Sequence, residues 1–142
     1  RSTQAKTLFP YTTLFRSIVM NSAKKKTLVI GASDNPERYS YIAMHRLQQH
    51  GHPVVAIGRN AQTVLGVPVV ATQEAFKEID TVTLYVSPAH QKEYYQYILS
   101  LHPQRIIFNP GAENEELGKL ANEKGIQTME ACTLVLLSTG QY

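Results

Sequence analysis

The chain has 142 residues, with 14 Lys and Arg against 11 Asp and Glu, and one cysteine, Cys132. No apolar run is long enough to span a bilayer, and one cysteine supports neither an internal disulfide framework nor a cysteine-based metal site, so we expect a cytoplasmic protein. Three of the basic residues lie in the first 19 positions, which are set apart from the folded domain below. The remaining residues, 20–142, have 11 basic and 11 acidic side chains, and this balance predicts binding to neither nucleic acid nor membranes.

The first 19 residues do not resemble a folded segment. Residues 7–17, TLFPYTTLFRS, match the in-frame translation of a common sequencing-library adapter. We therefore expect 1–19 to be an artefactual, disordered extension, the natural chain to start at Met20, and residues 20–142 to form one domain. The basic run 24–26 is typical of a solvated terminus, with an anion-binding role as the alternative.

The first element of that domain is a strand followed by a tight turn and a helix. Residues 27–30 (TLVI) predict a buried strand of a parallel sheet. The small and turn-forming residues 31–36 (GASDNP) end it, and residues 39–50 have apolar side chains at helical spacing. This arrangement directs backbone N–H groups and a helix N-terminus at a phosphate, although the G-x-G-x-x-G pattern of dinucleotide sites is missing.

Strand and helix patterns alternate through the remaining chain. Apolar, β-branched runs predict strands and amphipathic stretches predict helices. In chain order they are a strand 53–58, an extended piece 66–70, a helix 73–78, a strand 80–86, a helix 89–102, a strand 105–108, a helix 113–124, a strand 126–129 and a terminal helix 133–137. The alternation predicts an α/β fold, a doubly wound parallel sheet with helices on both faces.

Four predicted strands end in distinctive turns, at 31–33, 58–60, 87–89 and 109–111. The carboxyl ends of parallel strands meet at one edge of a sheet, where α/β proteins bind their ligands. Gly, Pro and Asn also end strands for purely structural reasons. Four such turns together nevertheless favour a binding crevice at this edge.

Arg59 follows the second strand, where an NAD site needs an acidic residue for the ribose hydroxyls. An arginine there instead suits a ribose that carries an extra phosphate, as in NADP or coenzyme A (CoA). A solvated surface arginine is the alternative. Arg38 could close over a pyrophosphate or pair with a carboxylate of its own helix.

Three segments carry a family resemblance: GASDNPERYSY, SPAHQ and NPGAENEEL. With them, nearly all of residues 26–132 resembles the small stand-alone bacterial CoA-binding proteins, which are similar to the CoA-binding domain of the succinyl-CoA synthetase α subunit. The chain differs from that family at Ile57-Gly58-Arg59, where the family has V-N-P. It also has Glu130-Ala131-Cys132 where the family has an Asp-Arg-Cys segment.

The resemblance implies a single Rossmann-like domain that holds CoA along its strand ends. By position it implies that the pyrophosphate contacts Gly31, Ala32, Ser33 and Arg38; the adenosine ribose phosphate contacts Gly58 and Arg59; the adenine or ribose contacts Val86, Ser87 and Pro88; and the pantetheine arm contacts Asn109, Pro110 and Gly111.

We expect non-catalytic binding of CoA or an acyl-CoA, with a homodimer or partner subunit possible. The alternatives are an NADP-binding oxidoreductase or redox sensor, and an interaction domain without a ligand. His90 and Cys132 are interpreted as structural residues, with a mixed disulfide between Cys132 and CoA as the minor alternative for the thiol. We also expect Gly31→Val to abolish CoA binding while the domain stays folded.

Overall fold

The computed structural model describes residues 23–142. Its central strand is β1 (Thr27–Ala32). Leu28, Val29 and Ile30 have no exposed surface, because helices cover both faces of the sheet here. Leu28 and Ile30 face one hydrophobic core and Val29 faces the other, since successive side chains of a strand alternate. The predicted extension 1–19 and the predicted start at Met20 lie outside the described residues.

The remaining elements follow with short connections. They are α2 (Tyr39–Gln49), β2 (Val54–Gly58), β3 (Gln62–Val64), β4 (Val67–Val70), β5 (Thr81–Leu84), α3 (Pro88–Gln91), the 3₁₀ turn η1 (Lys92–Tyr94), α4 (Tyr95–Leu101), β6 (Arg105–Phe108), α5 (Glu115–Glu123), β7 (Gln127–Glu130) and α6 (Thr133–Ser138).

The described strands form one seven-stranded sheet in the order β3-β4-β2-β1-β5-β6-β7. All neighbours pair in parallel except β3 and β4, which form an antiparallel hairpin at one edge. The chain runs outward from β1 through β2 to the hairpin, then returns to the other side of β1 as β5. The strand order therefore reverses between β1 and β5, and the predicted doubly wound α/β class is confirmed.

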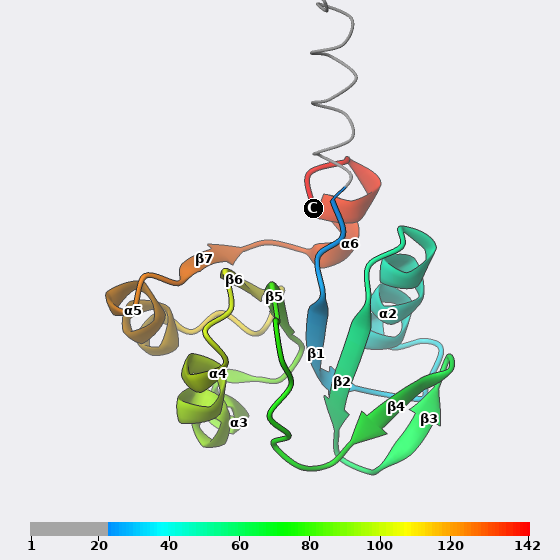
Figure 1. Ribbon diagram of the computed structural model, residues 1–142, viewed down its shortest axis with the longest axis horizontal. Helices are drawn as coiled ribbons and strands as arrows, with labels where there is room; N and C mark the ends of the chain where they lie inside the picture. The colour runs from blue at the N-terminus through cyan, green and yellow to red at the C-terminus, as the bar shows by residue number, and fades with distance from the viewer. Residues whose placement is uncertain (1–22) are drawn as a thin grey trace, which may run out of the picture.

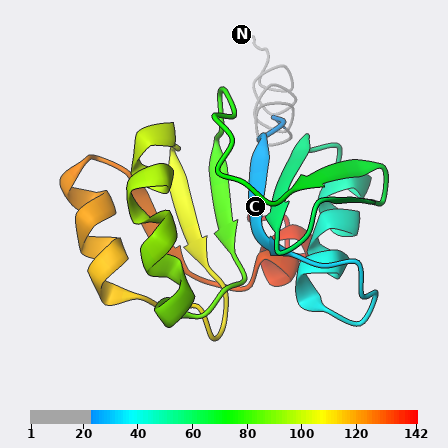
Figure 2. The same cartoon turned by 90° about the horizontal axis from the view of Figure 1, so that it is seen from below.

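The helices cover the two faces separately (Figures 1 and 2). One core contains Met44 and Leu47 of α2 together with Leu137 of α6. The other contains Ile98 of α4 and Leu117 of α5. Each face of the sheet is thus sealed by a different pair of helices, which leaves the carboxyl ends of the strands as the open edge.

The predicted helix 73–78 is wrong, because this segment has no helical turn. Two of its residues instead bond to groups far away in the sequence, Gln73 through its side-chain amide and Glu74 through its backbone carbonyl. The Gln73 amide donates to the Glu93 carbonyl at 2.7 Å, and the Tyr97 hydroxyl donates to the Glu74 carbonyl at 2.5 Å. Strand β3, in residues for which no element was predicted, exists because β4 offers it an antiparallel partner.

The predicted helix 89–102 exists, but it is broken into α3, η1 and α4. The buried Gln91 side chain at the end of α3 bonds to the loops on either side of it. The 3₁₀ turn that follows changes the direction in which residues 92–94 project. This break has consequences for the site described next.

Candidate functional site

A cleft of about 800 Å³ opens at the carboxyl ends of the strands, where β1 and β5 diverge. It is lined by turns after four strands and by the first residues of two helices. The lining residues are Gly31, Ala32, Ser33, Asp34, Glu37, Arg38, Tyr39, Ser40, Gly58, Arg59, Asn60, Gln62, Tyr85, Val86, Ser87, His90, Glu93, Tyr94, Pro110, Gly111 and Ala112.

Two glycines let the strand ends approach each other at the base of the cleft. Gly31 has a φ of +101°, and a Cβ there would lie 3.1 Å from the backbone of Tyr85, the residue that follows β5. A Cβ on Gly58 would lie 2.8 Å from the Ala32 carbonyl oxygen. Both positions therefore require glycine for close backbone contact, and the ladder between β1 and β2 shifts register here.

The loop from Ser33 to Arg38 is held by its own side chains. The Ser33 hydroxyl accepts from the Asn35 amide at 3.0 Å, and the Asn35 side chain accepts from the Glu37 amide at 2.9 Å. Arg38 then caps α2 without a side-chain hydrogen bond, and the first turn of α2 contains no acidic residue. The positive end of the α2 dipole, with its unbonded N–H groups, thus remains available to an anionic ligand.

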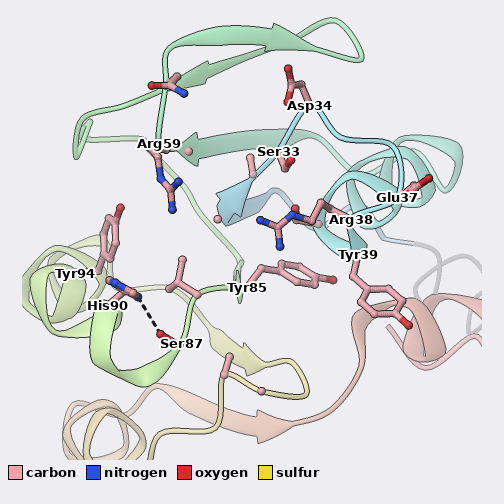
Figure 3. A pocket seen from close by; sticks show the side chains of 18 of the residues that line it. Ser33, Asp34, Glu37, Arg38, Tyr39, Arg59, Tyr85, Ser87, His90 and Tyr94 are labelled. Atoms are coloured by element: carbon pink, nitrogen blue, oxygen red, sulfur yellow. Dashed lines mark hydrogen bonds between the residues drawn. The ribbon is translucent and has the colours of Figure 1, made fainter.

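Two arginines from different elements face each other across the cleft (Figure 3). The guanidinium groups of Arg38 and Arg59 point toward its centre, whereas Asp34 and Glu37 point away from it. Neither guanidinium is hydrogen-bonded to another side chain drawn in Figure 3, where the one dashed line joins Ser87 and His90. The centre of the cleft is therefore cationic although carboxylates lie at its margin.

The opposite wall comes from β5 and the broken helix after it. The Ser87 hydroxyl and His90 Nδ1 are 2.9 Å apart, and His90 lies beside Tyr94 (Figure 3). Tyr94 and Glu93 line the cleft because η1 turns them toward it. Tyr85 lies below, with a buried hydroxyl that has no hydrogen-bond partner among the described residues, and burial raises its pKa.

Ten of the twelve predicted site residues line this cleft, and Pro88 and Asn109 do not. The Asn109 amide is buried and donates to the Thr83 hydroxyl at 2.7 Å and to the Leu84 carbonyl at 2.9 Å. Its oxygen accepts from the Thr133 amide at 2.9 Å. Asn109 thus supports the end of β5 and the start of α6 from beneath the cleft.

Sequence reasoning did not assign eleven of the lining residues to the site: Asp34, Glu37, Tyr39, Ser40, Asn60, Gln62, Tyr85, His90, Glu93, Tyr94 and Ala112. Most of them neighbour a predicted residue, so proximity in the chain was an available signal. Glu93 and Tyr94 had no such signal. They lie within the predicted helix 89–102, whose residues at this position are not expected to reach the cleft on a continuous helix.

Cys132 is a free thiol of intermediate exposure that precedes α6 and is not one of the residues lining the cleft. Among residues 23–142, no group of three His, Cys, Asp or Glu side chains is arranged to hold a metal ion. No helix in that part of the chain has the length and apolarity needed to cross a membrane.

Comparison with solved structures supports the same architecture. An uncharacterised protein is 48% identical with a TM-score of 0.83, over 84% of this chain and 99% of that one. A hypothetical protein from Pyrococcus horikoshii OT3 is 26% identical with a TM-score of 0.77, over 89% of each chain. A longer oxidoreductase from Bacillus cereus, 20% identical with a TM-score of 0.55 over 75% of this chain and 34% of that one, shares the fold.

No curated protein matches the chain significantly. The family model for a CoA binding domain, in contrast, matches residues 25–138, which include every turn that forms the cleft. The chain belongs to this family of CoA-binding domains.

Proposed function

We propose that the chain binds CoA or an acyl-CoA in the strand-end cleft and acts as a binding module. The observation that carries this proposal is the inward-facing pair of Arg38, at the N-terminus of α2, and Arg59, after β2, in the cleft that the turn at Gly31–Ser33 also lines. Such an arrangement favours a ligand with phosphates at two separate points. CoA has a diphosphate and a ribose 3′-phosphate.

The cleft suggests how this ligand lies. The diphosphate would bind the turn at Gly31–Ser33 and Arg38, and the 3′-phosphate would bind Arg59 after β2. The pantetheine arm would pass Pro110 and Gly111. A cleft of about 800 Å³ falls in the range of about 300–1,000 Å³ that is usual for small-molecule sites.

Arg59 provides the sharpest test, because dephospho-CoA lacks only the 3′-phosphate. We expect the wild-type protein to bind CoA more tightly than dephospho-CoA in calorimetric titrations. Arg59→Ala should weaken CoA binding about tenfold or more, since a charge-assisted hydrogen bond to phosphate is lost. It should leave the affinity for dephospho-CoA unchanged.

Arg46→Ala is the matched control, because it removes the same charge at an exposed position in the last turn of α2. It should leave both affinities unchanged. An Arg59 variant that loses equal affinity for both ligands would contradict the assignment of the 3′-phosphate. A wild-type protein that binds neither ligand would contradict the proposed function itself.

An NADP-binding oxidoreductase or redox sensor is the second candidate, and Arg59 is the observation that favours it. An arginine after the second strand also suits the 2′-phosphate of NADP. The fluorescence of reduced NADP makes its binding directly measurable. Binding of reduced NADP without binding of CoA would establish this candidate in place of the first.

The binding role also predicts that an acyl-CoA survives contact with the protein. The Ser87–His90 pair resembles a nucleophile and its base, yet the two residues lie within one turn, where the His90 amide also donates to the Ser87 carbonyl at 2.9 Å. Their contact therefore closes the first turn of α3. Acetyl-CoA incubated with the protein should be recovered intact by chromatography, and hydrolysis that Ser87→Ala removes would show a catalytic role.

A further inference from the structure

Gln91 is a polar residue with no exposed surface, behind the wall of the cleft. Its Nε2 donates one hydrogen bond to the Val86 carbonyl at 2.9 Å and another to the Ala112 carbonyl at 2.7 Å. Val86 belongs to the loop after β5, and Ala112 belongs to the loop after β6. Both residues line the cleft, so one amide group joins two of its walls.

Asn114 fixes the orientation of this amide. Its Nδ2 donates to Gln91 Oε1 at 2.9 Å and to the Tyr95 hydroxyl at 2.8 Å, while its Oδ1 accepts from the Leu117 amide at 3.1 Å. Every amide hydrogen of Gln91 and Asn114 is therefore used. A flipped Gln91 would place its oxygen against two carbonyl oxygens, so the network allows one arrangement.

We propose that Gln91 is a positioning residue that sets the spacing between the loop at Val86–Ser87 and the loop at Gly111–Ala112. The inference rests on the proposed function, with the adenine or ribose of CoA at the first loop, as the family resemblance implies, and the pantetheine arm at the second. A ligand that reaches both loops needs them at a defined separation. A ligand that reaches one loop does not.

Packing alone does not account for this residue. A buried amide without partners is costly, and an apolar side chain of the same length would fill the space as well. The bonds of Gln91 go to the two cleft loops and to the capping residue of α5. If Gln91 is replaced by an apolar residue, the Val86 and Ala112 carbonyls lose a buried donor, and the loops must move to bond with water.

The test is Gln91→Met, which keeps the length of the side chain and removes both donors. Affinities for CoA and for adenosine 3′,5′-bisphosphate, which lacks the pantetheine arm, are measured at a temperature where the variant is folded. We expect CoA binding to weaken about tenfold and the bisphosphate affinity to stay within about twofold of wild type. Equal losses for the two ligands, or no loss for either, would overturn the proposal.

Two controls separate spacing from stability. Gln96→Met makes the same change at an exposed site on α4, and Ile126→Val trims a buried side chain next to β7, at the end of the sheet away from the cleft. Neither should change the ratio of the two affinities. If Ile126→Val changes that ratio as Gln91→Met does, general destabilisation explains the effect and the proposal fails.

Hydrogen exchange of the ligand-free protein gives an independent readout. Gln91→Met should speed the exchange of the amides of residues 86, 87, 89 and 90 and of residues 111–113, and neither control variant should. The exchange rates test the spacing role even if the wild-type protein binds no CoA. Absence of CoA binding would contradict the proposed function but not the role of Gln91 in spacing the two loops. Unchanged exchange in both loops would overturn the inference.

Discussion

Single residues at the base of the cleft are constrained by the backbone. Gly31 combines a positive φ with a neighbouring strand too close for a Cβ, and Gly58 leaves no room beside Ala32. Asn109 satisfies three polar groups beneath the site. Residues that a sequence pattern assigns to ligand binding therefore also hold the strand ends together.

Gly31→Val illustrates this double role, and its expected effect differs from the one inferred from sequence. Valine at a φ of +101° is strained, and its Cβ would press on the Tyr85 backbone at 3.1 Å. We expect the free energy of unfolding to fall by about 1–3 kcal/mol or more, as measured by urea denaturation.

Gly66→Ala is the comparison, because Gly66 has a φ of +77° and open space around it. It should cost about 1 kcal/mol, from the backbone conformation alone. A Gly31→Val protein as stable as wild type would show that the strand ends can separate. Lost CoA binding in this variant is ambiguous, so Arg59→Ala is the better probe of the ligand.

At the scale of elements, the cleft depends on how helices begin and break. The β1–α2 turn was predicted from its residues because Gly31, Pro36 and a helical pattern from residue 39 follow closely on one another in the chain. The break after α3 could not be predicted in this way. It depends on Gln91 bonding to Val86 and Ala112, and Ala112 is 21 residues further along the chain.

Asn114 is the capping residue of α5 and a member of the Gln91 network, and two variants separate these roles. Asn114→Asp keeps an oxygen for the Leu117 amide but loses both donors. Asn114→Ala loses the cap as well. We expect alanine to be less stable than aspartate by about 1 kcal/mol, the usual value of a cap, in urea denaturation.

Both Asn114 variants should weaken CoA binding to a similar extent, because each leaves Gln91 without its donor. Asn122→Ala, at an exposed position further along α5, should change neither the stability nor the CoA affinity by a comparable amount. Full CoA affinity in the alanine variant would show that the cap and network do not influence the cleft.

At the scale of the whole molecule, buried tyrosines link stability to alkaline pH. Burial raises the pKa of Tyr97 to about 12 from the usual 10.0, and it also raises the pKa of Tyr85 and Tyr142. At a pH between 10.0 and about 12, Tyr97 loses its proton in the unfolded chain and keeps it in the folded protein. Stability should therefore be unaffected by this group below pH 10 and should fall as the pH rises toward 12.

Urea unfolding at about pH 8 and about pH 11 measures this loss. Tyr97→Phe should lower the free energy of unfolding at the lower pH, because the Tyr97 hydroxyl donates a hydrogen bond to the Glu74 carbonyl. It should also reduce the loss of stability between the lower and the higher pH, because phenylalanine has no proton to lose. Tyr39→Phe is the control, because Tyr39 is 71% exposed. An equal alkaline loss in all three proteins would contradict the role of the Tyr97 hydroxyl.

By itself, the sequence determined the class of the fold and most of the open edge of the sheet. Buried β-branched runs, helical spacing and turn residues are local signals, and parallel strands necessarily bring their carboxyl ends to one edge. The turns at Gly31–Ser33, Gly58–Arg59 and Pro110–Gly111 were predicted for this reason, and the structure brings them together.

Only the tertiary structure decided what holds these turns and which side chains complete the wall. The segment at 73–78 lost its predicted helix to bonds with α4 and η1, and β3 formed because β4 lay beside it. Glu93 and Tyr94 line the cleft, whereas Asn109 lies beneath it. Asn109 is held there by hydrogen bonds to residues distant in the chain. Such bonds depend on packing, which local propensity does not encode.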